Sequence, residues 1–119
     1  MPAKSCIILI STSVCASSNV RPAYLLYVST KGAVEQMTRA MAKDLATKDI
    51  NVNCIAPGPT GTALFYGGKS EAMVKEIAST NPHGRIGTPE EVAEAIALLC
   101  GEEGRWISGQ IIRVNGGMG

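Results

Sequence analysis

Three short stretches of the chain consist almost entirely of apolar residues. Between them, apolar residues recur every three or four positions, as on one face of a helix. The run Cys6-Ile7-Ile8-Leu9-Ile10 has no polar position, which is typical of a strand covered on both faces. Similar runs occur near Val52 to Ile55 and near Ile111 to Val114. We therefore predict strands at about residues 5 to 11, 50 to 56 and 110 to 114.

Helical spacing fills the intervals between these strands. Pro22 fits the first turn of a long helix that runs to about Ala46. Its apolar stripe is predicted to be Val34, Met37, Met41 and Leu45, with Glu35 and Arg39 paired on the solvent side. Strand, helix and strand in succession indicate a parallel sheet, so we expect an α/β fold with the three strands adjacent in chain order.

Two further helices follow the second strand. One begins near Ser70, with Met73, Val74 and Ile77 on one side. The other begins at Thr88-Pro89-Glu90-Glu91, which combines a cap hydroxyl, an early proline and a capping-box glutamate. Its predicted buried face comprises Val92, Ala93, Ile96, Leu98 and Leu99. Residues 57 to 69, rich in Pro and Gly, are predicted to form a loop.

Composition narrows the choice of partner. The 119 residues, 45% of them hydrophobic, suffice for one small domain with a core. The net charge is +1 with no run of one sign, so we expect a small-molecule substrate, no nucleic acid and no membrane surface. The apolar runs are too short for a signal peptide or a membrane span, which predicts a cytoplasmic protein.

The cysteines and the histidine give no metal pattern. Cys6, Cys15, Cys54 and Cys100 have no CxxC spacing, and His83 has no cysteine or second histidine near it. We interpret the cysteines as buried reduced thiols and His83 as a surface loop residue. No metal site is predicted.

The strongest chemical signal is Tyr27-Val28-Ser29-Thr30-Lys31. Residues four apart on a helix are neighbours on one face, so the phenol and the ammonium can act on the same reacting group. An ammonium beside a phenol favours the phenolate, which makes the pair a usable proton donor and acceptor. The spacing alone also arises by chance, so its context decides the interpretation.

That context consists of three further motifs. Ser11-Thr12-Ser13 follows the first strand, residues 51 to 58 read Asn-Val-Asn-Cys-Ile-Ala-Pro-Gly, and residues 109 to 117 end in Val-Asn-Gly-Gly. In order and spacing the four motifs resemble the short-chain dehydrogenase/reductase family over nearly the whole chain. Members loosely named after 3-oxoacyl carrier-protein reductases, from fungi and plants, are the most similar.

The resemblance implies a site and a reaction. Tyr27 would donate or accept the proton, Lys31 would lower the pKa of the tyrosine and hold the nicotinamide ribose, and a serine would orient the substrate carbonyl. Ser13, which lies 14 residues before Tyr27, matches the family spacing. Counting from the strand favours Thr12 instead, and Ser11 is a third candidate.

The resemblance also assigns a cofactor turn and a substrate lid. Pro57, Gly58, Thr60 and Thr62 would contact the nicotinamide, with Tyr27 and Lys31 on its ribose. Many relatives carry an aliphatic residue where Thr60 stands. Residues 63 to 79 would form a mobile lid over the substrate. The reaction is then the interconversion of a ketone and an alcohol, with NADP(H) favoured over NAD(H).

A large part of the family fold has no counterpart in this chain. The family places roughly 150 residues before the catalytic tyrosine, whereas 26 precede Tyr27 here. No G-x-G-x-x-G turn opens a helix, so residues 1 to 119 correspond to the catalytic carboxyl-terminal half of a Rossmann-like doubly wound sheet, without the half that binds the rest of the cofactor.

Three hypotheses remain at this point. The chain is a fragment of a reductase that forms homo-oligomers, or an inactive truncated product that binds full-length subunits through the helix at residues 24 to 46. The third hypothesis is an unrelated small ligand-binding domain whose four motifs match by accident.

Overall fold

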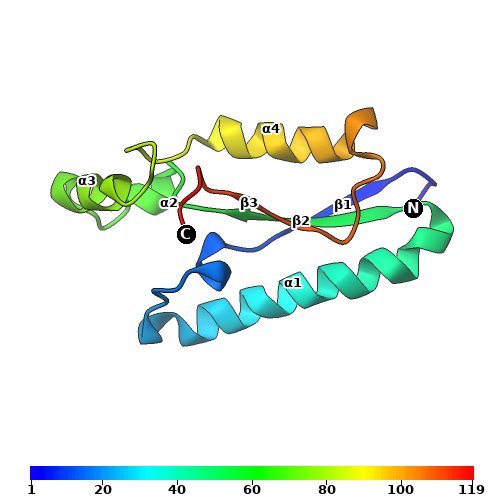
Figure 1. The fold of residues 1–119 in the computed structure, drawn as a ribbon, viewed down its shortest axis with the longest axis horizontal. Helices are drawn as coiled ribbons and strands as arrows, with labels where there is room; N and C mark the ends of the chain where they lie inside the picture. The colour runs from blue at the N-terminus through cyan, green and yellow to red at the C-terminus, as the bar shows by residue number, and fades with distance from the viewer.

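The computed structural model describes all 119 residues and has three layers (Figure 1). A parallel sheet lies between helix α1 (Leu25–Leu45) on one face and helix α4 (Pro89–Cys100) on the other. The strands are β1 (Cys6–Ile10), β2 (Asn51–Pro57) and β3 (Ile111–Val114), in the order β1-β2-β3. The predicted α/β class, strand positions and strand order are confirmed.

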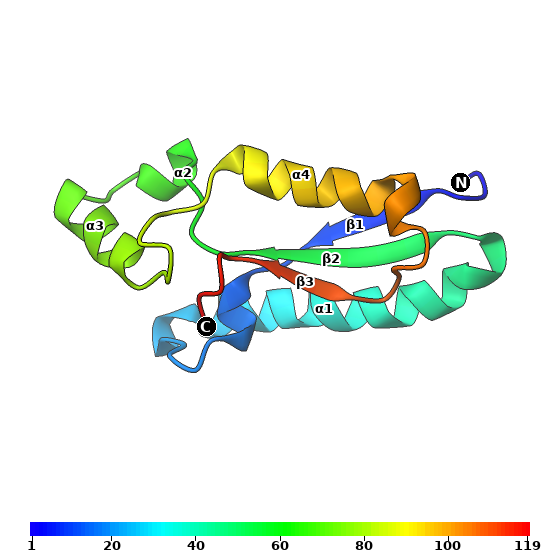
Figure 2. The ribbon, with the colours of Figure 1, turned by 45° about the horizontal axis from the view of Figure 1, so that its top comes forward.

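Short helical elements complete the chain. They are the 3-10 helices η1 (Ser13–Ala16), η2 (Pro22–Tyr24), η3 (Ala46–Lys48) and η4 (Glu102–Gly104), and the α-helices α2 (Ala63–Tyr66) and α3 (Glu71–Ser79). Helices α2 and α3 extend beyond the carboxyl ends of the strands (Figure 2). The loop predicted at residues 57 to 69 therefore contains one helical turn, α2, which the Thr62 hydroxyl caps by accepting the Phe65 N–H at 3.2 Å.

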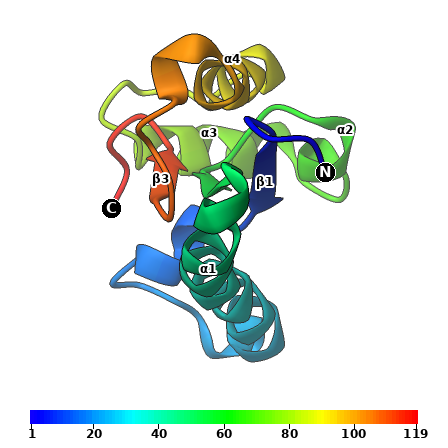
Figure 3. The ribbon, with the colours of Figure 1, turned by 90° about the vertical axis from the view of Figure 1, so that its right-hand side faces the viewer.

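Strand β2 forms the centre of the core. It pairs with β1 from Cys6↔Asn51 to Ile10↔Ile55, and with β3 from Cys54↔Ile111 to Pro57↔Val114. All five residues from Val52 to Ala56 are buried, because β2 has a strand on each side and a helix on each face (Figure 3). Asn53 is satisfied there by donating to the Ile107 carbonyl and accepting the Gln110 N–H.

The predicted stripe of helix α1 is confirmed in part: Val34, Met41 and Leu45 are half-buried. Thr38 and Ala42 are buried, whereas Met37, predicted to be core, is 51% exposed. Small side chains lie under the sheet because they allow the helix to approach it closely. The predicted solvent pair of Glu35 with Arg39 is also wrong: Glu35 is half-buried and accepts a hydrogen bond from Ser11, while Arg39 donates to Gln36.

Helix α4 begins with the predicted capping box. Thr88 Oγ1 accepts the Glu91 N–H, and the Glu91 carboxylate accepts the Thr88 N–H. Its inner face is Val92, Ala95, Ile96 and Leu99, so the predicted burial of Ala93 and Leu98 is wrong. Along helix α3, Val74 and Ile77 are half-buried, and Met73 is 48% exposed.

The molecule exposes more surface than a folded chain of its mass normally does. Its accessible surface is 7764 Å² for 12.4 kDa, against roughly 6,100 Å² expected for a compact monomer. Only 12 of the 119 residues are buried. Much apolar surface on both helical layers is therefore left uncovered. No helix combines the length and the apolar character needed to cross a bilayer.

Candidate active site

The motifs identified in the sequence converge at the carboxyl ends of the three strands. Strand β1 leads into residues 11 to 13, β2 into the turn at residues 58 to 62, and β3 into Asn115 (Figure 2). In parallel sheets this edge is where ligands bind, since loops from neighbouring strands meet there. The first turns of α1, which carry Tyr27 and Lys31, lie beneath the same edge.

Tyr27 and Lys31 lie one turn apart on α1. Tyr27 is 45% exposed, and its ring packs edge to face against Tyr24, with ring centroids 6.3 Å apart. Lys31 Nζ donates to the carbonyl of Ile10, the last residue of β1, at 3.0 Å. The ammonium is thus held at the carboxyl end of β1, next to the residues that follow that strand.

The three hydroxyls after β1 have different surroundings. Ser11 is buried and donates to the Glu35 carboxylate at 2.7 Å, with the Lys31 carbonyl at 3.4 Å. Thr12 is also buried, and its Oγ1 accepts the Val14 N–H at 3.3 Å to cap η1. Ser13 is only half-buried and forms no side-chain hydrogen bond, so its hydroxyl is available to a ligand.

Glu35 is a site-supporting residue that the sequence prediction missed. It follows Lys31 by one turn, so Tyr27, Lys31 and Glu35 share one face of α1. Its carboxylate fixes the Ser11 side chain, and this links α1 directly to the residues after β1. The same i, i+4 spacing from Lys31 indicates it, but the spacing between Glu35 and Arg39 competes with that interpretation.

The turn after β2 is held against β3 and Gly87. The Gly58 N–H donates to the Val114 carbonyl at 3.0 Å, and the Gly61 N–H donates to the Gly87 carbonyl at 2.8 Å. Thr60 Oγ1 donates to the Gly58 carbonyl at 2.8 Å, which closes the turn from within. Thr62 uses its hydroxyl oxygen as a helix cap, and this leaves the hydroxyl proton free to donate.

Gly58 is required by close packing. A Cβ at this position would lie 2.8 Å from Asn115 Cβ and 3.5 Å from Ser13 Oγ. The distance to Ser13 shows that the residues after β1 and the turn after β2 lie close together at this point. Asn115, the second residue that sequence reasoning missed, fills the space that a larger side chain at position 58 would need.

The cysteines and the histidine take no part in this site. His83 lies exposed in a turn, as predicted. Burial is the largest cause that raises the pKa of Cys54, which lies under α1 beside Thr38. Cys54 is buried, Cys6 and Cys15 are half-buried, and Cys100 is exposed, so the prediction of four buried thiols is wrong for Cys100. No group of His, Cys, Asp and Glu side chains is arranged to hold a metal.

Comparisons with known proteins identify the family of the chain. The family model described as Enoyl-(Acyl carrier protein) reductase matches residues 1–119. A "Short-chain type dehydrogenase/reductase" of Picea abies is 47% identical over 96 residues, which cover 81% of this chain and 35% of the relative. The "NADPH-dependent aldehyde reductase-like protein, chloroplastic" of Arabidopsis thaliana is 41% identical over 93% of this chain and 40% of its own length.

Solved structures show the same fold. The promiscuous reductase LugOII, described as catalysing keto-reduction at C1 during lugdunomycin biosynthesis, superposes with a TM-score of 0.88 at 37% identity over 99% of this chain and 46% of its own. The angucycline C-6 ketoreductase LanV with bound NADP gives a TM-score of 0.87 at 31% identity, over 99% of this chain and 45% of its own.

The fold is part of a Rossmann-like α/β domain. The chain belongs to the short-chain dehydrogenase/reductase family. It spans between 35% and 46% of the length of the curated relatives it matches. The hypothesis of an unrelated ligand-binding domain is therefore wrong.

Proposed function

We propose that residues 1 to 119 are the catalytic carboxyl-terminal half of a reductase that interconverts a ketone or aldehyde and an alcohol. The observation that carries this proposal is the placement of Tyr27, Lys31 and the free hydroxyl of Ser13 around one strand edge. In the proposed reaction Tyr27 would pass a proton to the carbonyl oxygen of the substrate, and a bound nicotinamide would supply the hydride. Ser13 donates a hydrogen bond to the same oxygen, where negative charge develops.

We propose NADP(H) as the hydride carrier. Two relatives from Arabidopsis thaliana are named NADPH-dependent, and similar solved structures contain NADP or NADPH. The residues present fit the nicotinamide end of such a cofactor. Pro57, Thr60 and Thr62 would contact it through a rigid turn with one free hydroxyl donor, and the close packing of Gly58 against Asn115 holds this turn near Ser13. Lys31 would bind the ribose.

The contacts for the other end of the cofactor are absent from these residues. No glycine-rich turn opens a helix after a strand in this chain. Catalysis depends on holding the hydride donor and the carbonyl in near-attack geometry, and a nicotinamide bound at one end alone is poorly fixed. We therefore expect that the 119 residues by themselves reduce no ketone.

The test uses a longer protein that contains these residues together with a cofactor-binding half, and it compares two tyrosine variants of that protein. A longer protein that carries these residues should reduce activated ketones with NADPH, and the 119-residue chain should not. In the longer protein Tyr27→Phe should lower kcat by at least about 100-fold. Tyr24→Phe is the matched control, since Tyr24 lies one turn earlier on the same surface at 42% exposure. Equal rates for both variants would make Tyr27 a structural residue.

A second candidate function rests on the exposed side of α1. Leu25, Leu26 and Met37 are 72%, 79% and 51% exposed, which is unusual for large apolar residues on one helix. A non-catalytic product of this length would bind full-length subunits through that helix. Co-purification of the tagged chain with the full-length protein, abolished by Leu26→Lys, tests it, whereas capture that Leu26→Lys leaves unchanged would exclude this surface.

A further inference from the structure

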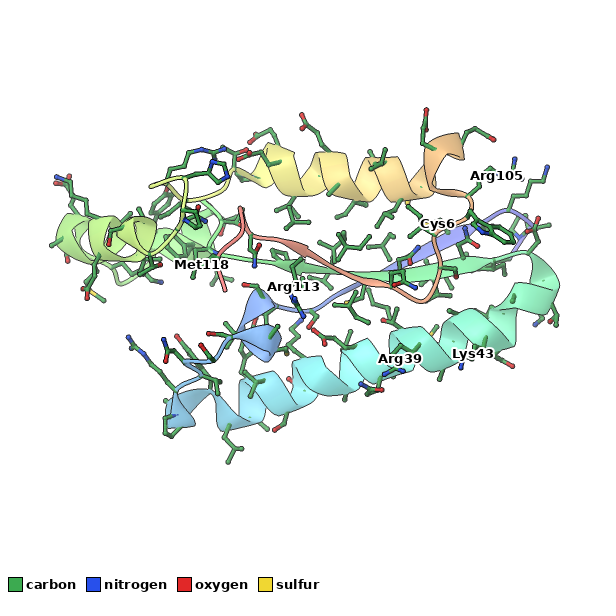
Figure 4. The ribbon with its side chains drawn as sticks, in the orientation of Figure 1. Cys6, Arg39, Lys43, Arg105, Arg113 and Met118 are labelled. Carbon is green, nitrogen blue, oxygen red and sulfur yellow. The ribbon has the colours of Figure 1, made fainter.

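Two cysteines from opposite ends of the chain meet at the amino-terminal end of the sheet. Cys6 is the first residue of β1, and Cys100 is the last residue of α4. Although they are 94 positions apart, their sulfur atoms are only 3.2 Å apart. Strand β1 runs from Cys6 toward the candidate active site, so the pair lies at the end of β1 away from that site (Figure 4).

The two thiols are close enough to be joined with a small movement. A disulfide has a sulfur-to-sulfur distance of about 2.05 Å, so the sulfurs must approach by roughly 1 Å. Cys100 ends α4, and Gly101 after it is in extended backbone outside the helix. Both cysteines are free thiols in the structure.

The cysteine pair is accessible to solvent, and the two cysteines differ in exposure. Cys100 is exposed. Cys6 and Cys100 both line a cavity of about 40 Å³, together with Lys4 and Arg105. Burial, followed by the contact with Cys100, raises the pKa of Cys6 to about 11. Cys6 therefore stays protonated near neutral pH, and the exposed Cys100 is the sulfur that a small oxidant reaches first.

We propose that Cys6 and Cys100 are a redox site, which a peroxide converts into an intramolecular disulfide. The Cys100 thiolate attacks one oxygen of hydrogen peroxide and breaks the O–O bond, giving a sulfenic acid and hydroxide, which becomes water. The Cys6 sulfur then attacks the Cys100 sulfur, and the S–O bond breaks. Hydroxide leaves and takes the Cys6 proton as a second water. Two thiols lose two electrons, and one peroxide is reduced.

The link ties an edge strand to the helix that covers it. In a denatured chain it would close a loop of 94 residues, which removes many unfolded conformations. The oxidised chain is therefore harder to unfold, and the thermal midpoint should rise by roughly 5 to 15 °C. Dithiothreitol should reverse this rise.

Peptide mapping after peroxide treatment tests the proposal. The full chain is oxidised near neutral pH, remaining thiols are blocked with N-ethylmaleimide, and the protein is cut with trypsin. The expected product joins residues 5 to 31 to residues 86 to 105. Because Cys15 lies in the first of these peptides, Cys15→Ser is the matched control and should keep the link. Cys6→Ser and Cys100→Ser should each abolish it.

Unfolded protein provides a second, independent comparison. In concentrated urea, Cys6 should pair mainly with Cys15, because closing a short loop costs less entropy than closing a long one. The native chain should show the opposite preference. The same product distribution in both states would overturn the proposal, as would a disulfide between two copies through Cys100 or oxidation of Cys100 without any link to Cys6.

Discussion

At the scale of single residues, the three hydroxyls after β1 differ in what their side chains already bind. Ser11 supports α1 through Glu35, Thr12 caps η1, and Ser13 is free at the surface of the site. A group that must donate to a substrate carbonyl needs an uncommitted proton. These surroundings favour Ser13, which the spacing from Tyr27 also indicates.

The first prediction distinguishes a serine that takes part in the reaction from one that stabilises the fold. In the longer reductase, Ser13→Ala should lower kcat/KM by roughly 100-fold or more with stability changed by less than about 0.5 kcal/mol. Ser11→Ala should instead lower the free energy of unfolding by about 1 to 3 kcal/mol, because the half-buried Glu35 carboxylate loses its donor. Steady-state kinetics and urea unfolding on both variants measure the two effects. A larger loss of kcat/KM at Ser11 than at Ser13 would contradict the assignment.

Gly58 gives the second residue-scale prediction. In Gly58→Ala the new Cβ would press on Asn115 Cβ at 2.8 Å and on Asn115 Cα at 3.1 Å, so backbone must move. We expect a loss of about 1 to 3 kcal/mol in the free energy of unfolding. Gly61→Ala is the control, since its Cβ would meet the Tyr66 hydroxyl, the far end of a side chain that can rotate away. Equal losses measured by urea unfolding would show that close packing at Gly58 is unimportant.

At the scale of elements, the sequence predicted helix ends better than helix faces. The start of α4 is encoded locally by Thr88, Pro89 and Glu91, so its capping box could be read directly. The buried stripe of α1 could be read only in part, because Thr38 and Ala42 are buried by their closeness to the sheet rather than by their hydrophobicity. An apolar pattern therefore placed Met37 and Leu98 in a core that neither enters.

The candidate site was predictable to a similar extent. Tyr27, Lys31 and the hydroxyls after β1 follow from spacing along the chain and from the rule that ligands bind at strand ends. The carboxylate of Glu35 and the side chain of Asn115 did not follow, since each acts through a tertiary contact with a distant segment. Only the packed structure shows which residues face Ser11 and Gly58.

The third prediction concerns acid stability at the start of α4. Hydrogen bonds from Arg85 and then from the Thr88 N–H lower the pKa of Glu91 from 4.5 to about 2. The folded state therefore holds the carboxylate ionised where the unfolded chain would protonate it. This contribution to stability is complete above about pH 4.5 and is lost as the pH falls toward about 2. Urea unfolding at a series of pH values, followed by circular dichroism, measures it.

A neutral variant isolates this effect. Glu91→Gln can still accept the Thr88 N–H but carries no charge, so the dependence of stability on pH between about 4.5 and 2 should become flatter. Glu90→Gln removes an adjacent carboxylate that forms no ion pair and should leave the dependence as in the parent. An unchanged slope in Glu91→Gln would place the acid sensitivity elsewhere. Since both Arg85 and Glu91 are solvent-exposed, the effect should weaken with added salt.

At the scale of the whole molecule, both the sheet and the helices have surfaces that no other element covers. Strand β1 pairs only with β2, so the N–H and C=O groups along its other edge have no strand partner. Leu25, Leu26 and Leu64 are 72%, 79% and 91% exposed. The radius of gyration, 15.5 Å, exceeds the roughly 13.5 Å expected for a compact chain of this length. These features agree with a chain that spans less than half of its relatives.

The last prediction is that the 119-residue chain self-associates in solution. A strand edge without charged or proline residues can add a strand from another copy, and the apolar face of α1 favours the same outcome. Size-exclusion chromatography with light scattering should show species larger than the monomer at micromolar concentration. Ile10→Lys places a charge at the exposed end of β1, and Leu26→Lys places one on α1, so comparing the two variants shows which surface drives association. A monodisperse monomer with a sharp cooperative unfolding transition would mean that neither the edge of β1 nor the apolar face of α1 drives self-association.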